Sequence, residues 1–92
     1  MRIVQVGLGA FGRGWLPIVR GSDGVELAGI VDTSNEARAW AEAQEVDPGA
    51  CLATLAEATA GVAFDAVLVV TPPETHRAVA EAALAAGKHV LV

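Results

Sequence analysis

Cysteine, aromatic side chains and basic residues are all scarce in this 92-residue sequence. The single cysteine, Cys51, excludes an internal disulfide and a cysteine-based zinc site, and we expect no metal site. Six Lys and Arg against eleven Asp and Glu give a net charge of −5. That balance argues against nucleic acid as a partner, because phosphate binding needs clustered basic side chains. No apolar run approaches the roughly 20 residues that span a membrane, so no membrane partner is expected either.

The composition is nevertheless that of a folded chain with a small core. Hydrophobic residues make up 53% and charged residues 18%, whereas disordered chains combine low hydrophobicity with high charge. The length fits one domain, residues 1–92, without a linker or a repeat. Met1 is followed within two residues by a strand-like run, which leaves no room for a signal or transit peptide. These features predict a cytoplasmic location.

Apolar patterning predicts strands that alternate with helices along the chain. Strands are expected at residues 3–6, 25–31, 66–70 and 88–92, with a short one at 51–52. Helices are expected near residues 11–21, 37–44 and 74–86, with a helical turn or two at 55–60. Pro17 should bend or break the first helix, and Gly87 is placed to end the last one in the left-handed conformation. The alternation predicts an α/β fold with a parallel sheet of about five strands and flanking helices.

The first strand-to-helix turn carries the spacing G-x-G-x-x-G, with glycines at 7, 9 and 12. In a dinucleotide site, Gly7 allows the tight turn, Gly9 lets a pyrophosphate approach the backbone, and Gly12 lets helix and strand pack closely. Ala10 and Phe11 lie between them, where free N–H groups at a helix N-terminus favour phosphate. The turn therefore predicts a partial Rossmann fold that binds a dinucleotide cofactor.

Asp32 closes the second strand, twenty residues past Gly12. A carboxylate there can accept hydrogen bonds from both ribose hydroxyls of adenosine, and it repels a 2′-phosphate. We therefore expect NAD(H) as the cofactor rather than NADP(H). A glycine-rich turn with a helix-capping Asp is the alternative interpretation. Arg38, the nearest cation, could lie over the adenine or reach a phosphate, but a solvated position on its helix is favoured.

Residues 71–76, Thr-Pro-Pro-Glu-Thr-His, follow the fourth strand and begin the last helix. His76 shares a helical stripe with Val79 and Ala83 that should face the sheet, so a buried structural histidine is favoured over a ligand contact. The glycine turn, Asp32 and this segment all follow carboxyl ends of strands. In a parallel sheet those ends share one edge, which predicts a single crevice.

On these motifs the sequence resembles the N-terminal domain of the Gfo/Idh/MocA oxidoreductases. The matching segments are the glycine turn, Val-Asp at 31–32, residues 71–76 and Gly-Lys-His-Val-Leu-Val at 87–92. The resemblance implies a Thr-Pro loop that runs along the cofactor, and a histidine that helps to hold this loop near it. Those roles would fall to Thr71, Pro72, Pro73 and His76.

The resemblance also implies a function, the NAD(H)-binding portion of a dehydrogenase. The full enzyme would transfer hydride between nicotinamide and a sugar, polyol or related alcohol, and only the full-length protein would bind this substrate. The family's Glu-Lys-Pro motif and substrate domain would lie beyond Val92. Alternatives are a non-catalytic nucleotide-binding sensor or scaffold and a dehydrogenase from another Rossmann family.

We expect no catalytic residue within the 92 residues, and no turnover by them alone. Lys88 begins the last strand, at the wrong end for a cofactor site, while His89 and Cys51 are interpreted as structural. The last strand should have an apolar, uncharged edge, which predicts self-association through that strand.

Overall fold

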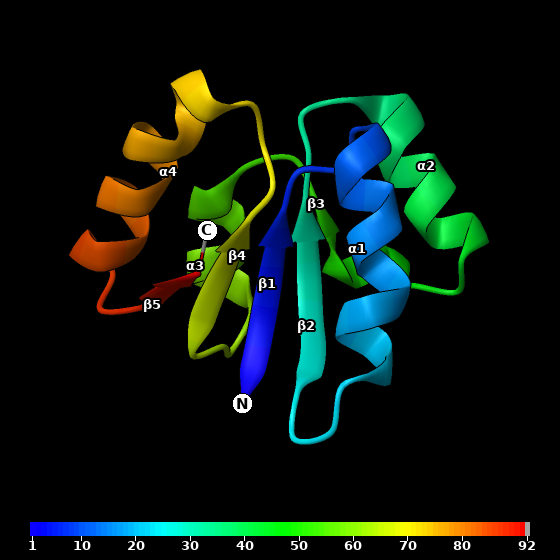
Figure 1. The fold of residues 1–92 in the computed structure, drawn as a ribbon, viewed down its shortest axis with the longest axis horizontal. Helices are drawn as coiled ribbons and strands as arrows, with labels where there is room; N and C mark the ends of the chain where they lie inside the picture. The colour runs from blue at the N-terminus through cyan, green and yellow to red at the C-terminus, as the bar shows by residue number, and fades with distance from the viewer. Residues whose placement is uncertain (92) are drawn as a thin grey trace.

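A computed structural model, which describes residues 1–91, shows a five-stranded parallel sheet flanked by helices (Figure 1). This confirms the expected α/β fold with its parallel sheet. The strands lie in the order β3-β2-β1-β4-β5. Their bounds are β1 Arg2–Val6, β2 Glu26–Val31, β3 Cys51–Leu52, β4 Ala66–Val69 and β5 His89–Leu91.

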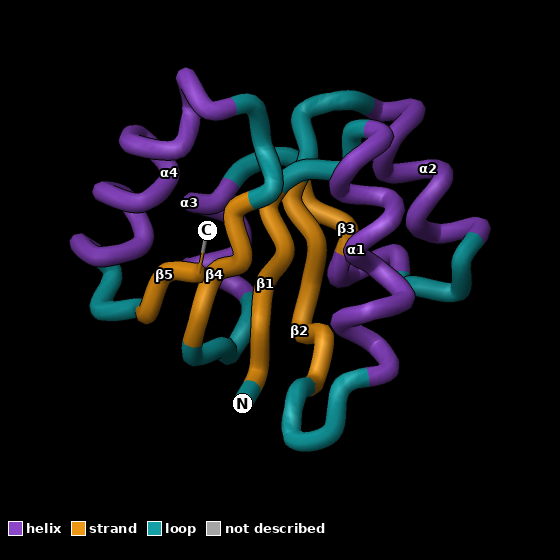
Figure 2. Tube along the Cα trace, viewed as in Figure 1, coloured by secondary structure: helices purple, strands orange, loops and turns teal. Residues whose placement is uncertain are grey.

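Helices cover both faces of the sheet (Figures 1 and 2). On one face lie α1 and α2, and on the other lie α3 and α4. A single 3-10 turn precedes β3. The bounds are α1 Ala10–Gly21, α2 Asn35–Ala43, the 3-10 turn Pro48–Ala50, α3 Leu55–Gly61 and α4 Pro73–Ala85.

The core is divided into two apolar layers by the sheet. Toward α3 and α4, Val4 and Val67 pack against Ala58 and other buried residues. Toward α1 and α2, Ile30 belongs to a second cluster, in which Leu16 is also buried. Because the inner strands are buried on both sides, they carry near-continuous apolar runs, as residues 66–70 predicted.

The order of the strands creates the place where the site lies. After β1 the chain builds β2 and β3 on one side, and then returns to add β4 and β5 on the other. The loops that leave β1 and β4 therefore diverge toward opposite faces. In open parallel sheets, a crevice forms outside the carboxyl ends of the strands at this reversal.

Of the two effects expected of Pro17, a break does not occur, because α1 continues through Pro17. Proline removes one backbone hydrogen bond, but Leu16 and Val19 on either side of it are both buried. Their burial holds the helix together across the missing bond. None of the helices within residues 1–91 reaches the length and apolar character that crossing a bilayer requires.

The end of α4 follows its prediction. Gly87 has a φ of +77°, and the N–H of Lys88 donates to the Ala83 carbonyl at 3.0 Å. This pairing is typical of helices that end on a left-handed glycine. The following strand begins at His89, one residue later than expected, and Val92 lies outside the described residues.

Candidate functional site

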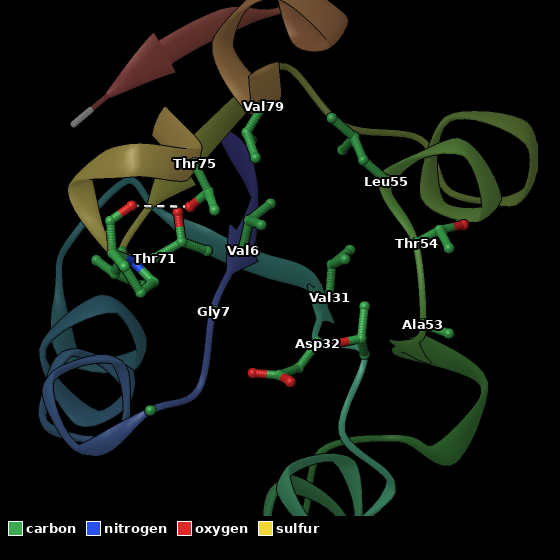
Figure 3. A pocket seen from close by; sticks show the side chains of 14 residues that line it. Val6, Gly7, Val31, Asp32, Ala53, Thr54, Leu55, Thr71, Thr75 and Val79 are labelled. Carbon is green, nitrogen blue, oxygen red and sulfur yellow. Dashed lines mark hydrogen bonds between the residues drawn. The ribbon is translucent and has the colours of Figure 1, made fainter. Parts of the chain in front are cut away.

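A pocket of about 530 Å³ opens at the carboxyl edge of the sheet (Figure 3). Four segments far apart in the sequence line it, namely residues 6–9, 31–33, 53–55 and 70–79 in part. The first, second and fourth contain the glycine turn, Asp32 and the Thr-Pro segment. The structure thus confirms that these motifs meet at one crevice, and the size of the pocket is that of a ligand site.

The three glycines of the turn have three different environments. Gly7 has a φ of +108°, and a Cβ on it would lie 2.8 Å from the Val70 carbonyl oxygen. A Cβ on Gly12 would lie 2.4 Å from the Gly7 carbonyl oxygen. By contrast, Gly9 lines the pocket, and a Cβ there would meet no atom within 4 Å. Gly7 and Gly12 therefore shape the turn, whereas Gly9 leaves open space beside the backbone.

The N-terminus of α1 has its first backbone N–H groups uncapped by any described side chain. Gly9 is the N-cap residue and carries no side-chain cap, and no acidic residue lies in the first turn. Ala10 and Phe11 are the first two residues of the helix, and the side chain of Phe11 lies outside the described part. Free N–H donors and the helix dipole make such an end favourable for a phosphate group.

The carboxylate of Asp32 is directed into the pocket (Figure 3). Its Oδ2 accepts a hydrogen bond from the Leu8 N–H at 2.7 Å, and its Oδ1 accepts one from the Ser34 N–H at 2.9 Å. A carboxylate offers about four lone-pair positions, so two remain for a ligand. The cap of α2 is Ser34, whose hydroxyl accepts from the Ala37 N–H at 3.2 Å. Asp32 is therefore not the capping residue of the following helix.

Arg38 is half-buried against the end of β2 rather than solvated. Its Nη1 donates to the Asp32 carbonyl oxygen at 2.6 Å, and its Nη2 donates to the Asn35 side-chain oxygen. The favoured solvated interpretation of Arg38 was wrong. Arg38 lies six residues after Asp32, and the turn of the chain into α2 brings its side chain back to the end of β2. There it contacts the backbone of Asp32, whose side chain faces the pocket.

The Thr-Pro segment is held by the first turn of α4. The Nε2–H of His76 donates to the Thr71 carbonyl oxygen at 2.6 Å. The Thr75 hydroxyl donates to the Pro72 carbonyl oxygen at 2.8 Å (Figure 3). The His76 side chain does not line the pocket, and its bond to the backbone agrees with the structural interpretation, although the side chain is half-buried rather than buried. Thr71 and Pro72 do line the pocket, while Pro73 is the first residue of α4.

Three contributors to the site were missed in the sequence. Gln5 is fully buried on β1, and its Nε2 donates to the carbonyl oxygens of Gly7 at 3.1 Å and Gly12 at 2.8 Å. In the sequence, the sign of this role was a polar amide side chain inside an otherwise apolar strand. Arg13 contacts the Leu8 carbonyl oxygen.

The third missed contributor is the pocket wall at residues 53–55. The hydroxyl of Thr54 accepts from the Glu57 N–H at 3.2 Å, and Glu57 Oε2 accepts from the Ala53 N–H at 3.2 Å. The spacing of Thr54 and Glu57 is that of a helix capping box, so it could have located the start of α3.

The remaining candidate side chains lie elsewhere. Lys88 precedes β5, where its Nζ donates to the Phe64 carbonyl at 2.9 Å and lies 4.4 Å from the centre of the Phe64 ring. Burial raises the pKa of the Cys51 thiol, and Glu42 and Asp47 add to the effect, so the thiol stays protonated. Within residues 1–91, no three His, Cys, Asp or Glu side chains are grouped to hold a metal ion.

A parallel sheet with this strand order, a glycine turn after β1 and an acidic residue after β2 defines a nucleotide-binding α/β domain of the Rossmann type. Comparison with known families specifies it further. The sequence model described as "Oxidoreductase family, NAD-binding Rossmann fold", that of the Gfo/Idh/MocA proteins, matches residues 1–92. The chain therefore belongs to the Gfo/Idh/MocA oxidoreductase family, as its NAD-binding Rossmann domain.

Individual relatives agree with this assignment. The chain is 39% identical, over all 92 residues, to 4-carboxy-2-hydroxymuconate-6-semialdehyde dehydrogenase of Sphingobium sp. (strain NBRC 103272 / SYK-6) and covers 29% of that protein. An NAD-binding protein from Listeria innocua matches 97% of the chain with a TM-score of 0.85 and 31% identity. A scyllo-inositol dehydrogenase from Lactobacillus casei, solved with NAD(H) and scyllo-inositol, matches 98% with a TM-score of 0.83 and 26% identity. The chain covers 26% of each of these two structures, so it spans less than a third of its relatives' length.

Proposed function

We propose that the pocket at the carboxyl edge of the sheet binds NAD(H), in preference to NADP(H). The observation that carries the proposal is the placement of the Asp32 carboxylate in the same pocket as the open face of Gly9. The Asp32 carboxylate suits an adenosine ribose, and the open space beside Gly9 suits a pyrophosphate. A sheet that merely needed a tight turn would require neither of them.

The residues of the turn fit the phosphate part of the cofactor. Gly9 leaves room for close approach, and the uncapped N–H groups at Ala10 and Phe11 are donors without a side-chain competitor. Gly7 and Gly12 act indirectly, because their missing side chains permit the shape of the turn. Their proposed roles are therefore to hold the backbone that contacts the pyrophosphate.

The preference for NAD(H) follows from the charges around Asp32. Its two unused lone-pair positions suit ribose hydroxyls, which are donors, and its negative charge opposes a 2′-phosphate. Arg38, a nearby cation, is held by the Asp32 carbonyl and by Asn35. Arg13 is paired with Glu36. A 2′-phosphate would thus meet a carboxylate, with both neighbouring guanidinium groups already engaged.

Thr71 and Pro72 are proposed to run along the bound cofactor, farther from the adenosine end. They line the pocket and follow β4, the neighbour of β1 across the reversal of strand order. His76 and Pro73 then act on the loop, His76 through its bond to the Thr71 carbonyl and Pro73 as the first residue of α4. The histidine's role in this proposal is to orient the loop, and it needs no change of protonation.

The whole protein that contains this chain is proposed to be a dehydrogenase. When bound, the nicotinamide ring supplies hydride transfer at its C4 atom. A sugar, polyol or related alcohol is the proposed substrate class, supported by the scyllo-inositol dehydrogenase among the structural relatives. An aldehyde is the second candidate, supported by the semialdehyde dehydrogenase at 39% identity. The chain's own residues bind and orient the cofactor.

Titration of the chain with NADH and NADPH, followed by cofactor fluorescence, tests the cofactor proposal. We expect tighter binding of NADH, and a loss of that preference in Asp32→Ala. Asp23→Ala is the matched control, because Asp23 is an exposed carboxylate in the turn before β2, at the other end of the strand. Equal or tighter binding of NADPH by the wild type would refute the assigned role of Asp32. For the whole protein, reduction of NAD in the presence of polyols, sugars or aldehydes would distinguish the two substrate classes.

A further inference from the structure

The backbone of Leu8, between Gly7 and Gly9, is held on both sides by groups outside the turn. Its N–H donates to Asp32 Oδ2 at 2.7 Å, and its carbonyl oxygen accepts from Arg13 Nε at 3.0 Å. The Leu8 side chain is itself only 1% exposed. Asp32 lines the proposed cofactor pocket, whereas Arg13 does not.

The guanidinium of Arg13 is in turn fixed by α2. Its Nη2 lies 3.0 and 3.1 Å from the two carboxylate oxygens of Glu36, and its Cζ lies 5.0 Å from the centre of the Trp40 ring. The Arg13 side chain is 30% exposed and that of Glu36 is 76% exposed. An exposed ion pair alone contributes little to stability, so a purely stabilising role would be small.

These contacts form a continuous link from α2 to the glycine turn. A trans peptide points its C=O and its N–H in opposite directions. The Arg13 contact with the Leu8 carbonyl therefore fixes which way the N–H of Gly9 faces. If this peptide group turned over, the Leu8 carbonyl oxygen would point where the Gly9 N–H now points. A carbonyl there would repel phosphate oxygens.

We infer that Arg13 is a positioning residue for the pyrophosphate-binding turn, acting on Leu8 from its anchor on Glu36 and Trp40. The inference rests on the dinucleotide function proposed above. Arginine suits the task because one planar group provides Nε for Leu8, Nη2 for Glu36 and a flat face for Trp40. A lysine ammonium has neither the fork nor the flat face.

The chain offers a matched control in Arg20, seven residues later on the same helix. Its Nη1 and Nη2 donate to the carbonyl oxygens of Gln44 at 2.5 Å and Glu45 at 3.5 Å, so it also links α1 to the α2 region. It does not contact the glycine turn. A variant lacking this arginine reports what the loss of one link between the helices does to binding.

The test compares two ligands, ADP-ribose with a pyrophosphate and adenosine without one, by NMR titration. Arg13→Leu is expected to weaken ADP-ribose about tenfold, the size of one lost hydrogen bond to a charged group, and to leave adenosine within about twofold. Arg20→Leu should change neither affinity. Arg13→Lys should recover part of the lost ADP-ribose affinity. If thermal melting shows that Arg13→Leu is unfolded, the two ligand affinities of Arg13→Lys are compared with those of the wild type instead.

Three outcomes would overturn the inference. In the first, Arg13→Leu binds ADP-ribose as tightly as the wild type. In the second, it weakens both ligands equally, which means a general structural effect. In the third, the wild type binds neither ligand. Only this outcome also refutes the proposed cofactor function, so it differs from the first two.

Discussion

Replacement of Gly12 by alanine should destabilise the fold, although alanine is the better helix former. Gly12 lies in α1, where helix propensity alone would favour alanine by about 1 kcal/mol. The added Cβ, however, would lie 2.4 Å from the Gly7 carbonyl oxygen and 2.9 Å from the carbonyl carbon, whereas ordinary contact starts at 3.4 Å. Both clashing atoms are backbone, so no flexible side-chain end can move aside.

The magnitude follows from the two opposing effects. Overpacking costs about 1–3 kcal/mol, and a contact this short against backbone belongs at the upper end. About 3 kcal/mol lost to the clash less about 1 kcal/mol gained in propensity leaves a net loss of about 2 kcal/mol. For a small domain with an unfolding free energy of roughly 5–15 kcal/mol, such a loss is easily measured.

Gly14→Ala is the control, because Gly14 lies on the same helix and a Cβ there would meet no atom within 4 Å. It should raise the free energy of unfolding by about 0.5–1 kcal/mol. Urea unfolding followed by far-UV circular dichroism measures both variants. The reasoning is refuted if Gly12→Ala is as stable as the wild type, or if the two variants shift in the same direction.

Three further predictions concern binding and association. Asp32→Ala should weaken NAD(H) binding by about 1.5–3 kcal/mol, the range for hydrogen bonds to a charged group, and isothermal titration would measure it. Gly9→Val should abolish dinucleotide binding while it leaves the melting temperature nearly unchanged, since the space it fills contains no protein atoms; unchanged affinity would show that the glycine serves only the turn. The isolated chain should self-associate in sedimentation through β5, an edge strand whose Leu91 is 44% exposed, and Leu91→Lys should suppress this. A monodisperse monomer would contradict the edge argument.

The elements of the fold were predictable because their signals are local. The apolar run at 66–70, the alternation of strand and helix, and the spacing of Gly7, Gly9 and Gly12 need no knowledge of distant residues. The crevice was also predictable, because in a parallel sheet the carboxyl ends of strands share one edge. The break that Pro17 could have caused does not occur, since local propensity at that position is outweighed by the burial of its neighbours.

The support of the site could not be predicted, because it depends on contacts between residues distant in sequence. Asp32 bonds to Leu8 across 24 residues, and Arg13 reaches Glu36 across 23. Nothing in the spacing of these residues encodes either contact. His76 likewise seemed to belong to the apolar stripe of α4, yet its ring turns back along the chain to the Thr71 carbonyl. A helical stripe gives the direction of Cα–Cβ, but it does not give the final rotamer of a long polar side chain.

The buried side-chain amide of Gln5 restricts the backbone conformation of the glycine turn. By binding the carbonyls of Gly7 and Gly12, it ties both ends of the turn to the central strand. Ordering a backbone residue costs about 1–2 kcal/mol in conformational entropy, and glycine loses the most. In the folded chain the Gln5 bonds already order the turn, so a ligand does not have to order it on binding. Affinity and folding are thereby coupled, because Gln5 is fully buried on the middle strand of the sheet and is released only when that strand unfolds.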